Sequence, residues 1–83
     1  MYEKLQQILA EVLGTDRSQI RPENRLVQDY GVDLFVLYQI MMRLEAAFGI
    51  RMQEEQIKNW HTVSDIWDDI RERHGEEDET GDH

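Results

Sequence analysis

The 83-residue chain contains no cysteine, one proline and only two serines, Ser18 and Ser64. Without cysteine, neither a disulfide framework nor a thiolate metal site can hold the fold together. Aromatic residues make up only 8% of the chain, and a chain of this length has room for one modest core. The fold must therefore come from the packing of a single small domain.

The chain also lacks the run of roughly 18 apolar residues that a membrane span requires. Basic residues are outnumbered, because 18 acids against nine bases give a formal charge of −9. Phosphate binding needs a basic stripe, and the sequence has none, so nucleic acid is excluded as a partner. The first residues are amphipathic and contain acids, unlike a signal peptide. These features indicate a cytoplasmic protein without membrane insertion.

The hydrophobic pattern predicts an all-α domain of three longer helices and one short helix. The first helix carries an apolar stripe at helical spacing, formed by Leu5, Ile8, Leu9, Val12 and Leu13. Gly14 follows this stripe as a stop signal. A second helix should run from Leu34 to Phe48, with Asp33 as its N-cap and Gly49 after its last turn.

Residues 15–33 show no helical period, and Pro22, Asn24 and Gly31 break this stretch into turns. A loop of this length is uncommon inside a compact domain and is often functional. Four apolar residues are expected to anchor the loop to the core: Ile20, Leu26, Val27 and Tyr30.

Residues 53–60 suit a short helical segment, and the last helix begins after Thr62. Asp65 follows this N-cap three residues later, close to the capping-box pattern. The inward stripe of the last helix consists of Val63, Ile66, Trp67 and Ile70. From Gly75 onward the chain is acidic and has no apolar residue, so we expect a helical domain over 1–74 and a disordered acidic tail over 75–83.

The stretch Asp29-Tyr30-Gly31-Val32-Asp33-Leu34-Phe35 resembles the entry to the second helix of the acyl carrier proteins, where the family has Asp-x-Gly-x-Asp-Ser-Leu. The segments "LGTDRSQIRPENRL", "MMRLEAAFGIRM" and "TVSDIWDDI" are similar to the family's first loop, the end of its second helix and its last helix. The resemblance covers roughly residues 2–72. It implies an acyl-carrier-protein-like four-helix bundle with a long first loop and a short third helix.

In this family a transferase attaches 4′-phosphopantetheine to the serine hydroxyl, and acyl groups are then carried on the terminal thiol. The resemblance places Leu34 at the position of that serine, directly after Asp33. An alkyl side chain has no oxygen to modify, so no cofactor is expected on the chain as written. Ser18 and Ser64 fall in the first loop and at the start of the last helix, where plain loop and cap roles explain them.

The second helix also departs from the family in charge. Carriers show acids along its exposed face, which basic patches on partner enzymes recognise by electrostatic steering. Here apolar residues follow Leu34, and Arg43 is expected to balance Glu45. Consecutive helical residues point in all directions, so some apolar surface should remain exposed at the helix start even with Phe35 and Phe48 in the core. The predicted partner-binding surface comprises Leu34, Val36, Leu37, Met42 and Met52, unless the long first loop covers it.

Catalytic and metal sites find little support in the sequence. A nucleophile needs a base within hydrogen-bond reach, and no Ser-His-Asp or Cys-His set is visible, so an enzyme is not expected. Trp60 and Trp67 are spaced seven apart in register with the last helix, which favours core packing over ligand stacking. His74 and His83 show no structural-zinc spacing, and no metal site is expected.

Two functions remain open. The first is a carrier-like module without the attachment serine, which binds a protein of a fatty acid, polyketide or related acyl or peptidyl biosynthetic system, or pairs weakly with a second copy of itself. The second is a genuine acyl carrier that bears acyl thioesters on phosphopantetheine and is altered at residue 34 or loaded elsewhere. A third reading, a bundle that holds an untethered lipid between its second and third helices, requires a cavity there.

Overall fold

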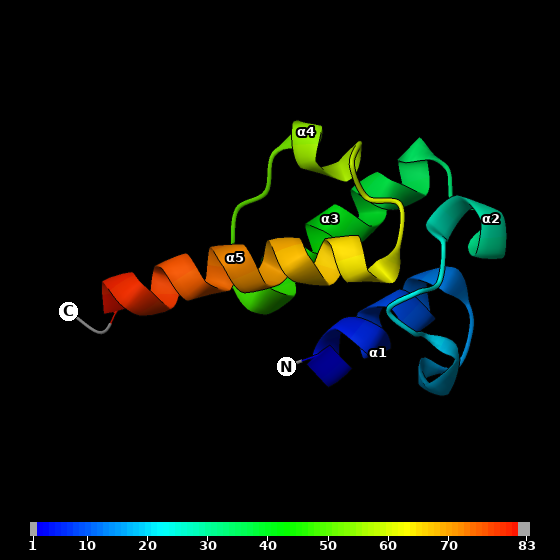
Figure 1. Cartoon of the computed structure of the whole chain (residues 1–83), viewed down its shortest axis with the longest axis horizontal. Helices are drawn as coiled ribbons and strands as arrows, with labels where there is room; N and C mark the ends of the chain where they lie inside the picture. Colours follow the sequence, from blue (N-terminus) through cyan, green and yellow to red (C-terminus); the bar gives the residue numbers. More distant parts are fainter. Residues whose placement is uncertain (1, 82–83) are drawn as a thin grey trace.

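The computed structural model describes the backbone of residues 2–81 and the side chains of residues 2–73. This part of the chain is helical and contains no strand (Figure 1). Its elements are α1 (Tyr2–Leu13), the 3-10 helix η1 (Arg17–Gln19), α2 (Leu26–Tyr30), α3 (Leu34–Phe48), α4 (Glu54–Ile57) and α5 (Val63–Gly81). The all-α fold class is therefore confirmed.

The two predicted glycine stops are also confirmed. Gly14 and Gly49 adopt φ angles of 70° and 64°, which side chains rarely tolerate, and they follow α1 and α3 directly. The end of α1 and both bounds of α3 thus lie where the sequence indicates.

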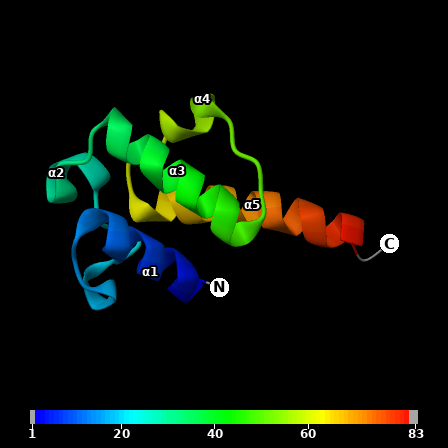
Figure 2. The ribbon, with the colours of Figure 1, turned by 180° about the vertical axis from the view of Figure 1, so that it is seen from behind.

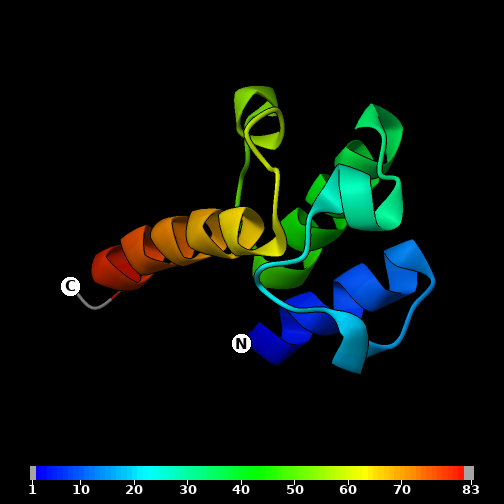
Figure 3. The same ribbon diagram turned by 45° about the vertical axis from the view of Figure 1, so that its right-hand side comes forward.

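The three longer helices, α1, α3 and α5, enclose one apolar core. Figures 1 and 2, which view the molecule from opposite sides, show α3 and α5 lying across each other, with α1 on one side of them and α4 on the other. Leu5 and Leu9 of α1 meet Ile40 and Leu44 of α3 in this core, and all four side chains are fully buried. Ile66 belongs to the same cluster from α5. Figure 3 shows α4 set apart from α1, beyond α3 and α5.

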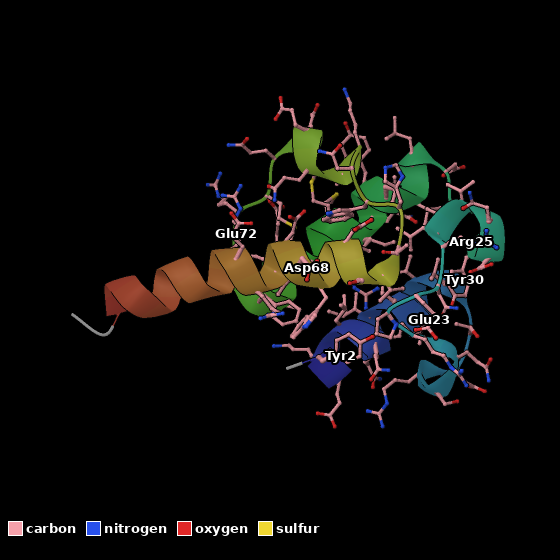
Figure 4. The ribbon with its side chains drawn as sticks, in the orientation of Figure 1. Tyr2, Glu23, Arg25, Tyr30, Asp68 and Glu72 are labelled. Carbon is pink, nitrogen blue, oxygen red and sulfur yellow. The ribbon has the colours of Figure 1, made fainter. Side chains whose placement is uncertain are left out.

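The connection between α1 and α3 is more structured than the sequence predicts. It contains η1 and α2, each too short to show a helical period. Ile20 and Leu26 are buried, as expected. The hydroxyl of Tyr30, a residue labelled in Figure 4, donates toward Asn24 Oδ1 at 2.9 Å and Gln19 O at 3.1 Å. Val27 was expected to be an anchor and is instead 59% exposed, because the single turn of α2 turns only Leu26 toward the core.

The start of α5 is held by this same connection. Val63 N donates to Asn24 O at 3.0 Å and Ser64 N donates to Pro22 O at 2.9 Å, so two of the first helical N–H groups find acceptors outside the helix. Thr62 and Asp65 form the predicted capping box, since Asp65 N donates to Thr62 Oγ1 at 3.2 Å and Thr62 N to Asp65 Oδ2 at 3.0 Å. The first connection and α5 thus stabilise each other.

The two tryptophans pack as the sequence predicts. Trp60 is buried, and the Trp67 ring is half-buried, meeting the ring of Tyr2 edge to face at a centroid distance of 5.1 Å. The backbone of α5 continues as helix to Gly81, whereas the sequence predicts an unstructured acidic tail from Gly75. The division of the chain at 74 and 75 stays a prediction, and residues 82–83 lie outside the described range.

Candidate functional site

The start of α3 is positioned by the turn that precedes it. Gly31 ends α2 with φ 64°, and its N–H donates to the carbonyls of Leu26 and Val27. Val32 is buried and ties the turn to the core. Asp33 then takes an extended conformation, and its Oδ1 accepts a 2.9 Å hydrogen bond from Val36 N. Asp33 is therefore the predicted N-cap, and Leu34 is the first residue of α3.

Asp29 stabilises the start of α2, the short helix that leads into this turn. Its Oδ2 accepts from Arg25 N at 2.7 Å, and the Arg25 guanidinium lies 3.4 Å from Oδ1. The backbone hydrogen bond from Arg25 and, to a smaller extent, the charge of its side chain lower the pKa of Asp29. Asp29 and Asp33 thus have structural roles on both sides of the Gly31 turn.

Several apolar side chains at this end of the molecule lie open to solvent. Leu34 is 51% exposed and Phe35 is 71% exposed. Further along α3, Met42 is 63% exposed. Val36 and Leu37 are half-buried and pack partly against the core. The exposed apolar surface predicted for this helix is present, and the first connection does not cover it.

Phe35 corrects the expectation that it belongs to the core. Successive α-helical residues are separated by about 100°, so the side of α3 that carries Ile40 and Leu44 lies opposite Phe35. Phe48 lies on the buried side and is 7% exposed, as predicted. The two phenylalanines could have been distinguished by which side of the helix each shares with the other apolar residues. The continuous apolar run from Leu34 to Tyr38 covers every side of the helix, so this signal is lost.

Met52 also differs from its predicted place. Its side chain is only 8% exposed, and its backbone N–H donates to Glu45 Oε2 at 2.9 Å. The segment after α3 folds back onto the bundle at this point, which removes Met52 from the surface that the sequence predicts to bind a partner. The exposed residues that remain from the predicted set are Leu34 and Met42, with Val36 and Leu37 half-buried beside them.

The charges of α3 are paired differently from the expectation. Arg43 forms a salt bridge with Glu11 of α1, whereas Glu45 accepts the backbone hydrogen bond from Met52. Arg43 therefore links α3 to α1 instead of balancing its neighbour Glu45. The single carboxylate of α3, that of Glu45, is thus bound by a backbone N–H and not by a basic side chain of its own helix.

A hollow of about 730 Å³ opens between α1 and α3. Its apolar lining comes from Ile8 and Val12 of α1 and from Met42, Ala46 and Ala47 of α3. Gln39 and Arg43 supply its polar lining. The hollow lies on the α1 side of α3, whereas the lipid reading of the sequence needs a cavity between α3 and α4.

The two serines are placed in different surroundings. Ser18 is exposed within η1, which is a single 3-10 turn. Ser64 is half-buried, and the backbone N–H groups around it already donate to the first connection. Neither serine sits at an open helix start like that of α3.

Metal binding finds no grouping of ligands in the described part of the chain. No three His, Cys, Asp or Glu side chains come together there in a way that could hold a metal ion. His61 is exposed, whereas the side chain of His74 and all of His83 lie outside what the structure describes. None of the helices within residues 2–81 has both the length and the hydropathy needed to cross a membrane.

Comparison with known proteins decides the family. The domain family described as "Phosphopantetheine attachment site" matches residues 3–70. The acyl carrier protein of Thermotoga maritima is 32% identical over 75 residues, which cover 90% of this chain and 93% of that protein. The chain belongs to the acyl carrier protein family. The family match runs from α1 into α5, so the start of α3 lies well inside it.

Proposed function

We propose that this acyl carrier protein homologue is a non-catalytic, cytoplasmic interaction module of a fatty acid, polyketide or related acyl or peptidyl biosynthetic system, and that it docks through the start of α3. The observation that carries the proposal is the chemistry of Leu34. It is the first residue of α3, it is half exposed, and its side chain has no nucleophilic atom. A side chain at this place can bury apolar area against a partner but cannot be esterified.

The residues at this position do not fit a phosphopantetheine group. Attachment forms a phosphodiester, which requires a hydroxyl oxygen on the protein. The nearest polar side chain is Asp33, and its carboxylate already caps α3 through Val36 N. The proposal therefore includes no step through a prosthetic group at residue 34.

Apolar exposure supports docking to a protein. A half-exposed leucine next to a largely exposed phenylalanine is costly to keep in water unless a partner covers them, at about 25 cal/mol for each Å² of apolar surface. Family members interact with biosynthetic enzymes, whose basic patches recognise acids along this helix. In this chain, by contrast, Arg43 is paired and the first turn of α3 holds no acid. Recognition here would depend on apolar contact more than on electrostatic steering.

A second candidate function is a genuine acyl carrier that is altered at residue 34 or loaded elsewhere. The family match, whose description names the attachment site itself, favours it. Ser18 or Ser64 would then have to be the attachment residue. The burial of Ser64 and the use of the N–H groups around it by the first connection argue against that residue.

The test measures intact mass after incubation with coenzyme A and a phosphopantetheinyl transferase of broad specificity. Three proteins are compared: the unaltered chain, Leu34→Ser and the matched control Leu34→Ala, which also shortens the side chain but adds no hydroxyl. The expected result is a gain of the prosthetic mass by Leu34→Ser alone. A gain by the unaltered chain would overturn the proposal and require mapping to Ser18 or Ser64. If none of the three gains mass, residue 34 does not stand at the attachment position.

Docking itself is tested by competition. The unaltered protein, which cannot be modified, should slow the modification of a standard acyl carrier protein by the same transferase. Leu34→Asp, which places a charge on the exposed apolar start of α3, should compete less well, whereas Val27→Asp on α2 serves as a control for added charge. No competition by the unaltered protein at high concentration would argue against an intact docking surface for this enzyme.

A further inference from the structure

The outer face of α3 carries a stripe that is typical of helix packing but has no partner within the chain. Phe35, Gln39, Met42 and Ala46 are all exposed and follow one another at spacings of four, three and four. This is the alternation by which one helix seats its side chains against another. Residues with these spacings lie within a narrow sector of the helix surface. The stripe, here called the α3 seam, is thus a second apolar face on an already amphipathic helix.

The α3 seam is neutral although the chain is strongly acidic. The formal charge of the protein is −9, yet none of the four seam residues carries a charge. The flanking Arg43 is paired with Glu11 of the same chain. A surface without acids in such a protein allows two copies to approach without carboxylates facing each other, whereas it offers nothing for a basic patch to recognise.

The seam also contains a protrusion and a hollow of complementary kind. Phe35 is the most exposed of the large apolar residues in the described structure. Ala46 lies eleven residues later, about 16 Å along the helix, and lines the hollow between α1 and α3 together with Ile8 and Val12. Gln39 and Met42 of the seam border the same hollow. A large ring at one end of the stripe is therefore followed, on the same helix, by a space that the rest of the stripe borders.

We propose that two copies of the chain pair through their α3 seams in antiparallel orientation. In a two-fold interface, residue i of one copy meets residue j of the other and the reverse, so a protrusion and a hollow on one surface satisfy each other twice. Phe35 of each copy enters the hollow of the other beside Ala46, and Gln39 meets Met42. Figure 2 shows α3 on the near side of the molecule, with α1 beside it.

The inference rests on the proposed function in one respect, because the paired copies would cover Phe35 next to Leu34 and so compete with an enzyme for the start of α3. The interface is small, with four seam residues and the border of the hollow from each side, and therefore belongs to the weak, transient class. Self-association would then cover the start of α3 at high protein concentration and expose it to an enzyme on dilution.

The dependence on salt concentration distinguishes a second copy of the chain from a basic partner protein at this surface. Two copies that each carry −9 repel each other, so the dimer should tighten as ionic strength rises from about 0.05 M to 0.5 M. Docking to a basic enzyme surface should weaken over the same range. The two kinds of interface thus respond to salt with opposite signs.

The experiment measures the monomer–dimer equilibrium of the full chain by sedimentation equilibrium at both salt concentrations. Phe35→Ala and Ala46→Glu should each weaken dimerisation about tenfold or more, the first by removing the inserted ring and the second by filling the hollow and adding a charge. Val27→Ala and Ser18→Glu are matched controls that change an exposed apolar residue and an exposed polar residue away from the seam, and both should dimerise like the parent. All four positions are exposed, so each variant should fold.

Three results would overturn the inference: a monomer at every concentration, a dimer that Phe35→Ala leaves unchanged, or a dimer that loosens with salt. The orientation has its own test, because the chain contains no cysteine. A mixture of Gln39→Cys and Met42→Cys proteins should oxidise mainly to the mixed disulfide, whereas Phe35→Cys should not crosslink to itself. A failure here leaves the transferase experiments on Leu34 unaffected, so the inference and the proposed function can fail separately.

Discussion

The indole N–H of Trp60 donates to Oδ2 of Asp69 at a distance of 2.6 Å. Trp60 precedes α5 and Asp69 lies in its second turn, so the bond fixes the segment after α4 against the helix that follows. Trp60 is almost completely buried, and its polar atom would have no alternative acceptor in the core. This contact links the segment that follows α4 to the longest helix, α5.

Asp69→Ala should destabilise the protein by about 1–3 kcal/mol, because the buried indole N–H loses its acceptor. Asp69→Asn keeps an oxygen in place and should cost less. Asp68→Ala, on the exposed side of the same helix, should stay within about 0.5 kcal/mol of the parent. Urea denaturation followed by tryptophan fluorescence measures all three, and equal losses for Asp68→Ala and Asp69→Ala would show that the bond is not stabilising.

The two phenylalanines of α3 should differ sharply when changed to alanine. Phe48→Ala removes a buried ring that also lies 5.2 Å from the Lys4 ammonium, and we expect a loss of about 3–5 kcal/mol. Phe35→Ala alters a side chain that is mostly in water, and its cost should be about 0.5 kcal/mol or less. Chemical denaturation at low protein concentration, where self-association is negligible, compares them. Similar losses would place Phe35 in the core after all.

Leu34→Ser should leave the fold intact. The side chain is half exposed and stands at the first position of α3, where serine is tolerated. We expect a change of about 1 kcal/mol or less, measured by thermal unfolding. A drop of about 2–5 kcal/mol, the range of a large-to-small core change, would mean that Leu34 is buried in solution.

Gly31→Ala tests the turn that sets the start of α3. Gly31 has φ 64°, and an added Cβ would meet no atom within 4 Å, so the cost is conformational alone. A left-handed residue other than glycine costs about 1–2 kcal/mol. Denaturant unfolding should show a loss of that size for Gly31→Ala. A neutral result would indicate that the turn relaxes to another conformation.

The capping box of α5 predicts a specific pH dependence. Burial alone would raise the pKa of Asp65, but hydrogen bonds from the backbone N–H groups of His61 and Thr62 outweigh it and lower the pKa. A carboxyl whose folded pKa lies below its unfolded value of about 3.9 stabilises the fold above that pH. This contribution is lost as the pH falls through the lower, folded pKa.

Asp65→Asn should therefore cost about 1 kcal/mol at pH 7 and progressively less below about pH 4. The measurement is urea unfolding of both proteins between pH 7 and pH 2.5. Asp68→Asn removes one exposed carboxylate from the same helix and serves as the control. A difference between parent and Asp65→Asn that stays constant with pH would show that the carboxylate charge does not contribute.

Much of the fold could be predicted from local signals. Asp33, Gly14 and Gly49 each act through their own backbone geometry, so the bounds of α3 and the end of α1 follow from residue type. The helix α2 escaped prediction because it has one turn and depends on tertiary contacts, such as the bond from Tyr30 to Gln19. Such contacts between residues far apart in the chain cannot be recognised from the local sequence.

The candidate site could be predicted in part, and its errors concern the burial of single apolar residues. Leu34 and Met42 are exposed, as the sequence predicts. Phe35 and Val27 are predicted to be buried and are exposed, whereas Met52 is predicted to lie on the surface and is buried. For Phe35 the reason is local: α3 begins with five apolar residues, so residue type does not show which of them face inward, and only packing against the core decides it. Val27 and Met52 lie outside α3. Their burial depends on the single turn of α2 and on the segment after α3, which folds back onto the bundle.

The backbone hydrogen bonds between the first connection and the start of α5 join segments about forty residues apart, through Asn24 with Val63 and Pro22 with Ser64. The isolated bridge between Arg25 and Thr62 lies beside them. The last helix therefore fixes the first connection in place. A chain cut after α4 would lose these hydrogen bonds, and its first connection would no longer be ordered. Folding of the two halves should consequently be one cooperative event, in which the amides of Val63 and Ser64 exchange with solvent only when the whole domain opens.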